Sequence, residues 1–229
     1  MDMTTRLVLF SPLDAIAVTA LVAAWLLIGW WVERAPAHRP SVSRIMDQYR
    51  REWMQQMVTR DPRIFDAQIL GGLRQGTAFF ASTAVIAIGG TLALIGNAEQ
   101  LAGVAQDLAA SPQPTTVWEA KLLVLALFLT NAFLKFAWSN RLFGYSAVLL
   151  GATPNNPDDP NANRRASQAA EITISAARSF NKGLRSVYFA LTAVAWLAGP
   201  LPLLAATGFT FVIIWRREFA SQSRKILTS

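Results

Sequence analysis

The chain has 229 residues, of which 53% are hydrophobic and only 15% are charged, and it carries a formal net charge of +7. A soluble domain carries about 25% charged residues, so this composition is typical of an integral membrane protein. The absence of cysteine and the single histidine, His38, exclude disulfides, thiolate metal sites and cysteine nucleophiles, and they leave no histidine cluster for a metal or a haem. We therefore expect no metal site and no cofactor.

Membrane spans are predicted where the chain runs for a long stretch with few charges. A helix needs roughly 20 apolar residues to cross a hydrocarbon core about 30 Å thick. Four segments meet this requirement or come close to it, and they cover approximately residues 13–32, 75–96, 118–138 and 187–215. The third includes Lys121 and Lys135 near its ends, where long amines can reach the interface while their stems stay apolar. The sequence thus predicts an all-α, polytopic membrane protein, with one membrane domain over residues 1–229 built as a four-helix transmembrane bundle.

The start of the first span has a local sequence signature. Ser11, Pro12 and Asp14 fit an N-cap serine, a proline at the first helical position and the carboxylate of a capping box. A cleaved signal peptide is the competing interpretation, because residues 35–37 (Ala-Pro-Ala) resemble a cleavage site. The apolar run is long for the core of a signal peptide, so we expect a retained transmembrane helix.

The orientation of the spans follows from the distribution of lysine and arginine. The first loop and its exit carry eight arginines between residues 33 and 74, and the third loop carries six basic residues between 141 and 185. The second loop, residues 97–120, has none before Lys121. Because basic loops stay in the cytoplasm, we expect a multi-pass protein of the cytoplasmic (inner) membrane, with loops one and three cytoplasmic and the N-terminus periplasmic. This distribution accounts for the net charge without a nucleic-acid partner.

The side of the C-terminus is left open by the sequence. Four spans place it outside, yet the tail carries the basic residues Arg216, Arg217, Arg224 and Lys225. The fourth segment is broken at its midpoint by Gly199, Pro200 and Pro202, and each proline removes a backbone donor. One interpretation is a single kinked span, which we favour because late charges influence topology less than early ones. The other is a re-entrant hairpin, which returns the tail to the cytoplasm.

Two cytoplasmic helices are predicted outside the spans, at about residues 43–60 and 165–182. In the first, Ile45, Tyr49 and Trp53 recur every four residues on one face, with charged and amide side chains on the others. This pattern is typical of an amphipathic interfacial helix that lies on the inner leaflet. A helix docked on protein has the same pattern, so both interpretations stay open.

Two groups of polar residues are candidate sites. Asn131, Lys135 and Ser139 are spaced four apart and share one helix face, which indicates either a polar cavity or, as we favour, a packing amide beside an interfacial lysine. The arginines that stand where spans meet the cytoplasm are candidates for binding lipid phosphates or an acidic partner; they are Arg74, Arg141 and Arg185. Ordinary positive-inside arginines are the alternative.

Two stretches resemble a known family. The first begins at Ala67-Gln68 and continues as GLRQGTAFFAST over residues 72–83, and the second is FNKGLRSVYF over residues 180–189, followed by Trp196 and Gly199-Pro200. They resemble a family of bacterial and plant membrane proteins catalogued as domain of unknown function 599, from Leu13 to about Phe219. The resemblance implies a multi-helix membrane protein and no established activity.

The residues that catalysis needs are missing from the spans. No carboxylate lies inside a predicted span, and no nucleophile with a base and no glycine-rich phosphate loop can be named. We therefore expect a non-enzymatic bundle that packs with the lipid bilayer, including anionic lipid, with a partner membrane protein or with further copies of itself. The alternative is a small-solute channel or transporter built around Asn131, Lys135 and the helix break. An enzyme that acts on lipid is a third, less supported hypothesis.

Overall fold

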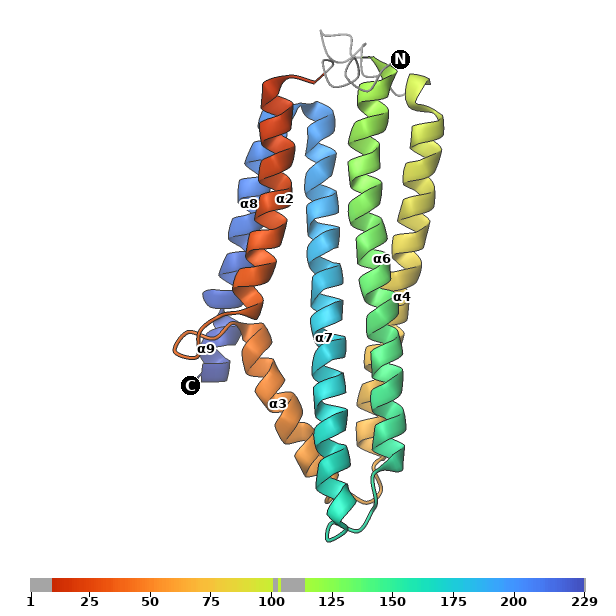
Figure 1. The fold of residues 1–229 in the computed structure, drawn as a ribbon, viewed down its shortest axis with the longest axis vertical. Coiled ribbons are helices and arrows are strands. Elements are labelled where there is room, and N and C mark those ends of the chain that lie inside the picture. The colour runs from red at the N-terminus through yellow and green to blue at the C-terminus, as the bar shows by residue number, and fades with distance from the viewer. Residues whose placement is uncertain (1–9, 101–102, 104–113, 229) are drawn as a thin grey trace. The chain divides into compact units, whose positions relative to one another are not determined.

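The computed structural model describes residues 10–100, 103 and 114–228, and every regular element within them is a helix. The helices follow in the order α2 (Pro12–Glu33), α3 (Val42–Met57), α4 (Ile64–Gly96), α6 (Thr115–Ala152), α7 (Pro160–Val194), a 3-10 turn η1 (Ala195–Ala198), α8 (Pro200–Phe219) and α9 (Gln222–Thr228) (Figure 1). The all-α prediction is confirmed.

Among the described residues, three helices are long and apolar enough to cross a membrane, namely α2, α4 and α6. The 38 residues of α6 correspond to about 57 Å at 1.5 Å per residue. A hydrocarbon core is about 30 Å thick, so a helix of this length continues beyond the apolar layer. The expected spans 75–96 and 118–138 are therefore the apolar parts of longer helices.

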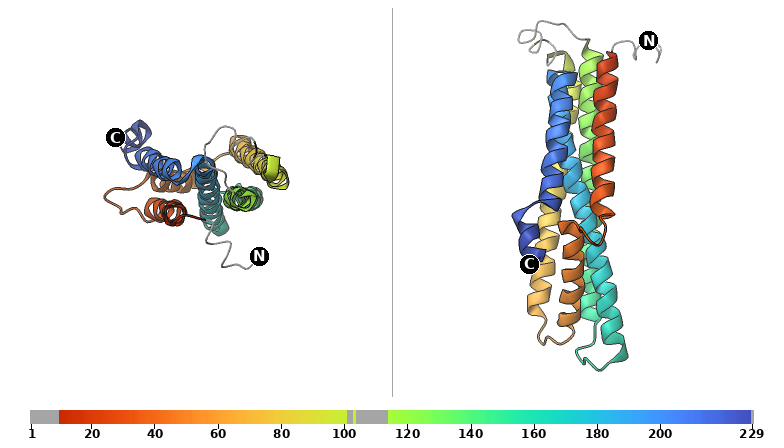
Figure 2. Two further views of the ribbon diagram at one scale, coloured as in Figure 1. Left: turned by 90° about the horizontal axis from the view of Figure 1, so that it is seen from above. Right: turned by 90° about the vertical axis from the view of Figure 1, so that its left-hand side faces the viewer.

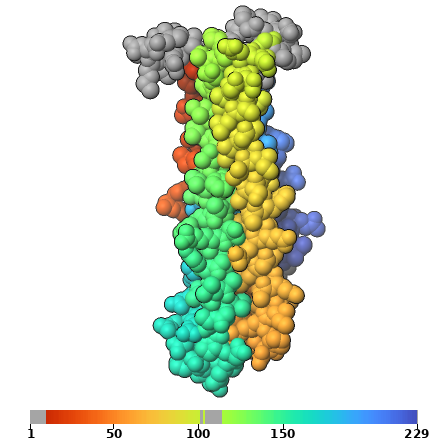
Figure 3. All heavy atoms as spheres, turned by 90° about the vertical axis from the view of Figure 1, so that its right-hand side faces the viewer, coloured from red at the N-terminus to blue at the C-terminus, as the bar shows by residue number. Residues whose placement is uncertain are grey.

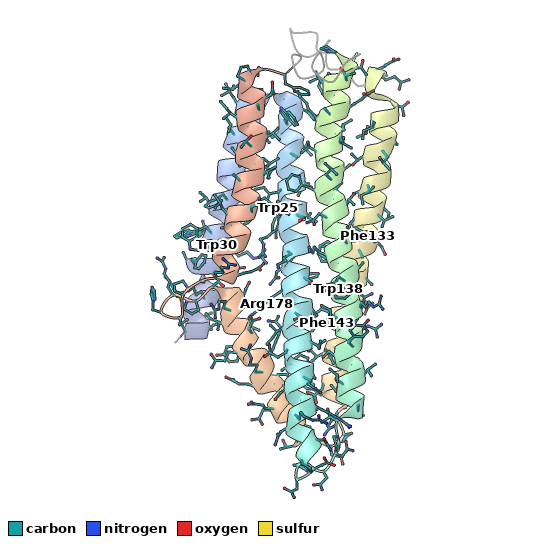
Figure 4. All side chains as sticks on the ribbon, viewed as in Figure 1. Trp25, Trp30, Phe133, Trp138, Phe143 and Arg178 are labelled. Carbon is teal, nitrogen blue, oxygen red and sulfur yellow. The ribbon has the colours of Figure 1, made fainter. Side chains whose placement is uncertain are left out.

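The contacts divide the chain into two compact units. Unit 1 contains Met1–Trp30, Thr83–Ala132 and Leu184–Trp215, and unit 2 contains Trp31–Ser82, Phe133–Gly183 and Arg216–Ser229. In unit 1, α7 lies between the pair formed by α2 and α8 and the helix α6 (Figure 2). Its Phe189 ring stacks on Phe128 of α6 at 6.3 Å. Phe128 in turn meets Trp25 of α2, which Figure 4 labels, edge-on at 5.4 Å.

In unit 2, α6 and α7 pack closely because α7 presents small side chains. Its buried alanines face a cluster that includes Leu142, Phe143 and Leu150 of α6; the alanines are Ala162, Ala166, Ala169, Ala170, Ala176 and Ala177. Small residues let helix backbones approach each other, and hydroxyl groups then reach across. Ser139 Oγ donates to the carbonyl of Ala176 at 2.7 Å, and the hydroxyls of Ser146 and Thr173 are 2.6 Å apart.

Three phenylalanines join α4, α6 and α7 in unit 2. The rings of Phe80, Phe136 and Phe180 have centroids 5.4 Å apart in every pairing. Aromatic pairs at this spacing stabilise packing beyond the area that they bury. The cluster leaves space only for hydrogen at Gly183, where an added Cβ would lie 2.6 Å from Cε1 of Phe136.

Helix α3 covers most of the expected segment 43–60 and docks on protein in unit 2. Asp47 is almost fully buried and accepts two hydrogen bonds from Arg178 of α7, at 2.7 and 3.1 Å. Trp53 Nε1 donates to Asp66 of α4 at 2.7 Å. Met54 and Met57, which belong to α3 itself, are buried. The helix is therefore seated on α4 and α7, and Tyr49 remains exposed.

Arg63 connects two loops of unit 2. Its guanidinium donates to the carbonyl of Met57, the last residue of α3, at 3.1 Å and to that of Val58 at 3.3 Å. It also donates to the carbonyls of Thr153 and Pro154 after α6, at 2.5 and 2.7 Å. One planar cation thus satisfies four carbonyls at or just after the ends of two helices, a pattern suited to its forked donors.

The predicted start of the first span is confirmed at α2. The amide of Asp14 donates to Ser11 Oγ at 3.1 Å, and the amide of Ser11 donates back to Asp14 Oδ2 at the same distance. These reciprocal bonds are those of a capping box.

The expected organisation of the last third of the chain is wrong in two respects. The segment 165–182 is not a separate helix, because α7 runs without a break from Pro160 to Val194. The segment 187–215 is not a single kinked helix either. The hydroxyl oxygens of Thr192 and Thr210 are 2.7 Å apart, whereas 18 residues of straight helix span about 27 Å. The chain therefore reverses between α7 and α8 (Figure 1).

The reversal has a local physical cause. Gly199 adopts φ +120°, a region that other residues rarely occupy, and its amide donates to the carbonyl of Trp196 at 2.9 Å. Pro200 then starts α8, at the position where a proline is best tolerated. The residues interpreted as a kink are the end of one helix and the beginning of the next.

Candidate functional site

Two of the predicted arginines share one surface of unit 2. Arg74 lies on α4 and Arg141 on α6, and both are exposed. A Cβ at Gly144 would lie 3.9 Å from both Cζ and Nε of Arg74, so this guanidinium lies against α6 one turn beyond Arg141. In unit 2, α4 and α6 run side by side on the face that Figure 3 presents.

Arg141 is held in place by its neighbour on α6. Its Nε donates to the hydroxyl of Tyr145 at 2.5 Å, and its Cζ lies 5.7 Å from the centre of the same ring. Such contacts restrict a side chain that is otherwise mobile in solvent. Arg141 is thereby oriented without being neutralised, since tyrosine carries no charge at neutral pH.

The surroundings of Arg141 are apolar and exposed. Leu134, Trp138, Arg141, Tyr145 and Val148 follow one another at spacings of four and three residues, so they form one face of α6, which we name the exposed α6 stripe. The four members other than Arg141 have large hydrophobic or aromatic side chains that are exposed on the surface of the protein. Figure 4 labels Trp138 on this helix. The arginine thus stands in the middle of an apolar stripe.

Arg185 has a different setting. It belongs to unit 1, only 6% of its surface is exposed, and a Cβ at Gly29 would lie 3.8 Å from its Nε. A buried guanidinium does not present itself to a headgroup as a surface arginine does. The structure thus brings Arg74 and Arg141 to one surface of unit 2 and gives Arg185 a separate, buried place in unit 1.

Two members of the predicted polar group make bonds between helices. Asn131 Nδ2 donates to Ser186 Oγ of α7 at 2.6 Å within unit 1. Ser139 bonds to the backbone of α7 within unit 2, as described above. Lys135 is half-buried. The bonds of Asn131 and Ser139 are those of packing groups, which favours the packing interpretation of these residues over a cavity.

A cluster that the sequence did not predict lies at the turn between α7 and α8. Trp196 Nε1 donates to Asp14 Oδ1 at 2.7 Å. The amine of Lys121 lies 5.2 Å from the ring centre of Trp118 and 5.9 Å from that of Trp196. Lys121 is only 2% exposed, so its amine is covered by protein. The spacing of Trp118 and Lys121 hinted at this contact, but no sequence signal pairs Asp14 with Trp196.

The end of the chain is bonded to the first loop within unit 2. Glu218 accepts hydrogen bonds from the amide of Ser43 at 3.1 Å and from its hydroxyl at 3.0 Å. Arg224 Nε donates to the carbonyl of Pro40 at 3.1 Å. The C-terminal residues are therefore next to the segment that leads into α3.

Within the described part of the chain, the fold and these sites define a helical protein with three helices of membrane-spanning length and with basic residues gathered in unit 2. The chain belongs to the family described as "Protein of unknown function, DUF599", whose model matches residues 16–223. This match confirms the resemblance seen in the sequence. No curated protein and no solved structure matches the chain.

Proposed function

We propose that the chain is a non-catalytic protein of the cytoplasmic membrane that crosses the bilayer five times, with its N-terminus in the periplasm and its C-terminus in the cytoplasm. The observation that carries this topology is the pair of contacts from Glu218 to Ser43 and from Arg224 to Pro40. Groups within hydrogen-bond distance cannot lie on opposite sides of a bilayer. The first loop carries eight arginines and is cytoplasmic by the positive-inside rule, so the tail is cytoplasmic too.

Five crossings remove the conflict that four crossings create. The apolar part of α7 and the helix α8 supply two antiparallel segments in place of one, and the basic tail then shares a side with the other basic segments. Residues 184–198 and 200–215 are shorter than a usual span of about 20 residues. The uninterrupted helices lengthen these segments at their cytoplasmic ends, because α7 continues back to Pro160 and α8 on to Phe219.

The role that the surface supports best is binding of membrane lipid at the cytoplasmic side. Exposed Arg74 and Arg141 stand on an apolar face of unit 2, a combination that suits the boundary between headgroups and acyl chains. A partner membrane protein or a second copy is the other class of occupant. Purification in mild detergent followed by mass spectrometry separates these classes, since a stoichiometric protein partner contradicts the lipid role.

Reporter fusions test the topology. Fusions after Arg63, Arg165 and Ser229 are expected to report a cytoplasmic location, and insertions at residues 108 and 199 a periplasmic one. A cytoplasmic signal at residue 199 together with a periplasmic signal after Ser229 contradicts the five crossings. A periplasmic signal after Arg63 contradicts the whole orientation.

A small-solute channel or transporter is the second candidate, and one observation favours it. Lys121 and Arg185 are basic residues buried within unit 1, and ionisable groups buried in membrane segments often mark the path of a solute. Flux of small anions into liposomes that contain the purified protein tests this candidate. Flux that disappears in Lys121→Met supports it, and flux no greater than that of empty liposomes contradicts it.

A further inference from the structure

We infer that Arg74 and Arg141 bind the phosphate of one anionic glycerophospholipid, with Gly144 of α6 beneath the Arg74 guanidinium. This inference rests on the proposed function and deepens it by naming the ligand class and the residues. The two guanidinium groups come from different helices of unit 2, and Arg74 lies against the α6 backbone at Gly144.

The small size of the residue at position 144 lets Arg74 lie against α6. Only a small group fits below its guanidinium, because the Cβ position at Gly144 is 3.9 Å from Cζ and Nε of Arg74. That distance is an ordinary contact for a methyl group, whereas a larger side chain displaces the arginine. Gly144 therefore allows the Arg74 guanidinium to stand one helical turn from Arg141.

The chemistry of the two arginines matches a phosphate. Guanidinium groups donate paired hydrogen bonds to phosphate oxygens and remain charged at every physiological pH. Arg141 is already oriented by the Tyr145 hydroxyl and ring, so binding costs it little side-chain entropy. Both arginines are exposed, and their charges are therefore available to a headgroup.

The neighbouring residues fit the rest of a lipid. Leu134 and Trp138 precede Arg141 on the exposed α6 stripe, and Phe79 follows Arg74 on α4; all three are more than half exposed. They lie toward the apolar parts of both helices, where acyl chains belong, and tryptophan favours the headgroup boundary. The site thus combines a charged end with an apolar extension.

Charge decides between a lipid and a second copy of the chain. A twofold interface at this face would bring the same two arginines of each copy toward each other, and like charges that face each other across an interface oppose association. An anionic lipid instead offers a negative phosphate to both cations, and its acyl chains cover the apolar stripe. We therefore assign the face to lipid.

Native mass spectrometry of the full chain tests the site, with dioleoyl phosphatidylglycerol as the anionic probe and dioleoyl phosphatidylcholine as the neutral one. Arg74→Ala and Arg141→Ala are each expected to weaken phosphatidylglycerol binding roughly five-fold, and the double variant roughly 25-fold. Arg164→Ala is the matched control, since Arg164 is an exposed arginine of unit 2 that bonds to Asn161. Binding of phosphatidylcholine should not change.

Variants at Gly144 distinguish a specific binding site from general electrostatic attraction of the lipid to basic residues. Gly144→Leu keeps both arginines but displaces Arg74, so we expect it to lower phosphatidylglycerol binding about as much as Arg74→Ala does. Gly144→Ala should bind as the native chain does. Circular dichroism and size-exclusion elution of each variant show that it is folded.

Three results would overturn the inference: equal loss in Arg164→Ala and Arg74→Ala, equal binding of the two lipids by the native chain, or native affinity in Gly144→Leu. A lipid-free dimer that Arg141→Glu dissociates would assign the face to a second copy instead. The topology reporters are independent of these measurements. Failure of the lipid site thus leaves the proposed orientation standing, whereas a periplasmic signal after Arg63 removes the proposed function itself.

Discussion

Gly183 on α7 and Phe136 on α6 are so close that a Cβ on the glycine would lie 2.6 Å from Cε1 and 2.8 Å from Cδ1 of the ring. The ring has little room to yield, because Phe80 and Phe180 pack on it at 5.4 Å. Gly183 thus lets α7 approach α6 where three helices of unit 2 meet.

Gly183→Ala is therefore expected to destabilise the protein by about 1–3 kcal/mol, the usual effect of overpacking a core. Thermal unfolding in detergent measures the change. Gly71→Ala is the matched control, since Gly71 is also helical and nothing lies within 4 Å of an added Cβ. This control should be neutral or more stable by up to about 1 kcal/mol. Equal melting of Gly183→Ala and the native protein would contradict the close packing.

Glu218→Ala should loosen the beginning of α3. The carboxylate satisfies the amide and the hydroxyl of Ser43, and loss of such a capping group costs about 1 kcal/mol. Hydrogen exchange of the amides of residues 42–46 is expected to accelerate roughly five-fold. Glu171→Ala serves as the control, because its ion pair with Arg51 is exposed on both sides and contributes little. If both variants exchange alike, the tail does not hold α3.

Arg63→Ala should destabilise unit 2 more than the loss of a surface arginine does. Four loop carbonyls lose their donor together, and hydrogen bonds to charged groups contribute about 1.5–3 kcal/mol each before exposure reduces them. We expect a loss of at least about 2 kcal/mol in unfolding by denaturant. Arg63→Lys keeps the charge without the fork and should be intermediate. Arg164→Ala should be as stable as the native chain. If Arg63→Ala were equally stable, the hydrogen bonds of Arg63 to the four carbonyls would not contribute to stability.

The sequence predicted those features of the fold that depend on neighbouring residues. The capping box at Ser11 and Asp14, the helix near residues 43–60 and the break at Gly199 all have local signatures. The continuity of α7 was missed because its polarity changes near Ser186, and a change in polarity does not interrupt a helical backbone. The burial of Lys121 was missed because Trp196 contacts its amine from a distant part of the chain.

The sequence predicted which residues could form the candidate site, but not how their side chains are placed. The positive-inside rule selected Arg74, Arg141 and Arg185 for their place along the chain, but it says nothing of the direction in which a helix presents each side chain. Only the packing of α4 on α6 shows that Arg74 lies at Gly144, one turn from Arg141. Likewise, only the helix packing in unit 1 shows that Arg185 is buried.

The reversal at Gly199 can be tested by cross-linking, because the native chain has no cysteine. The side-chain oxygens of Thr192 and Thr210 are 2.7 Å apart, so cysteines at both positions have the proximity that a disulfide requires. We expect Thr192→Cys with Thr210→Cys to oxidise rapidly in membranes. A single kinked helix would hold the two positions roughly 27 Å apart and would give no intramolecular bond.

The control pairs Thr192→Cys with Val212→Cys, since Val212 is exposed on α8, and it should remain reduced. A protease site inserted after Gly199 lets the disulfide be read from fragments that stay joined until reduction. Free thiols in the Thr192 and Thr210 pair, with the same fragments separating without reductant, would contradict the antiparallel arrangement of α7 and α8 and the five crossings that depend on it. Replacing Pro200 and Pro202 by Ala should leave the cross-link intact, because Gly199 at φ +120° turns the chain and the prolines only begin the helix that follows.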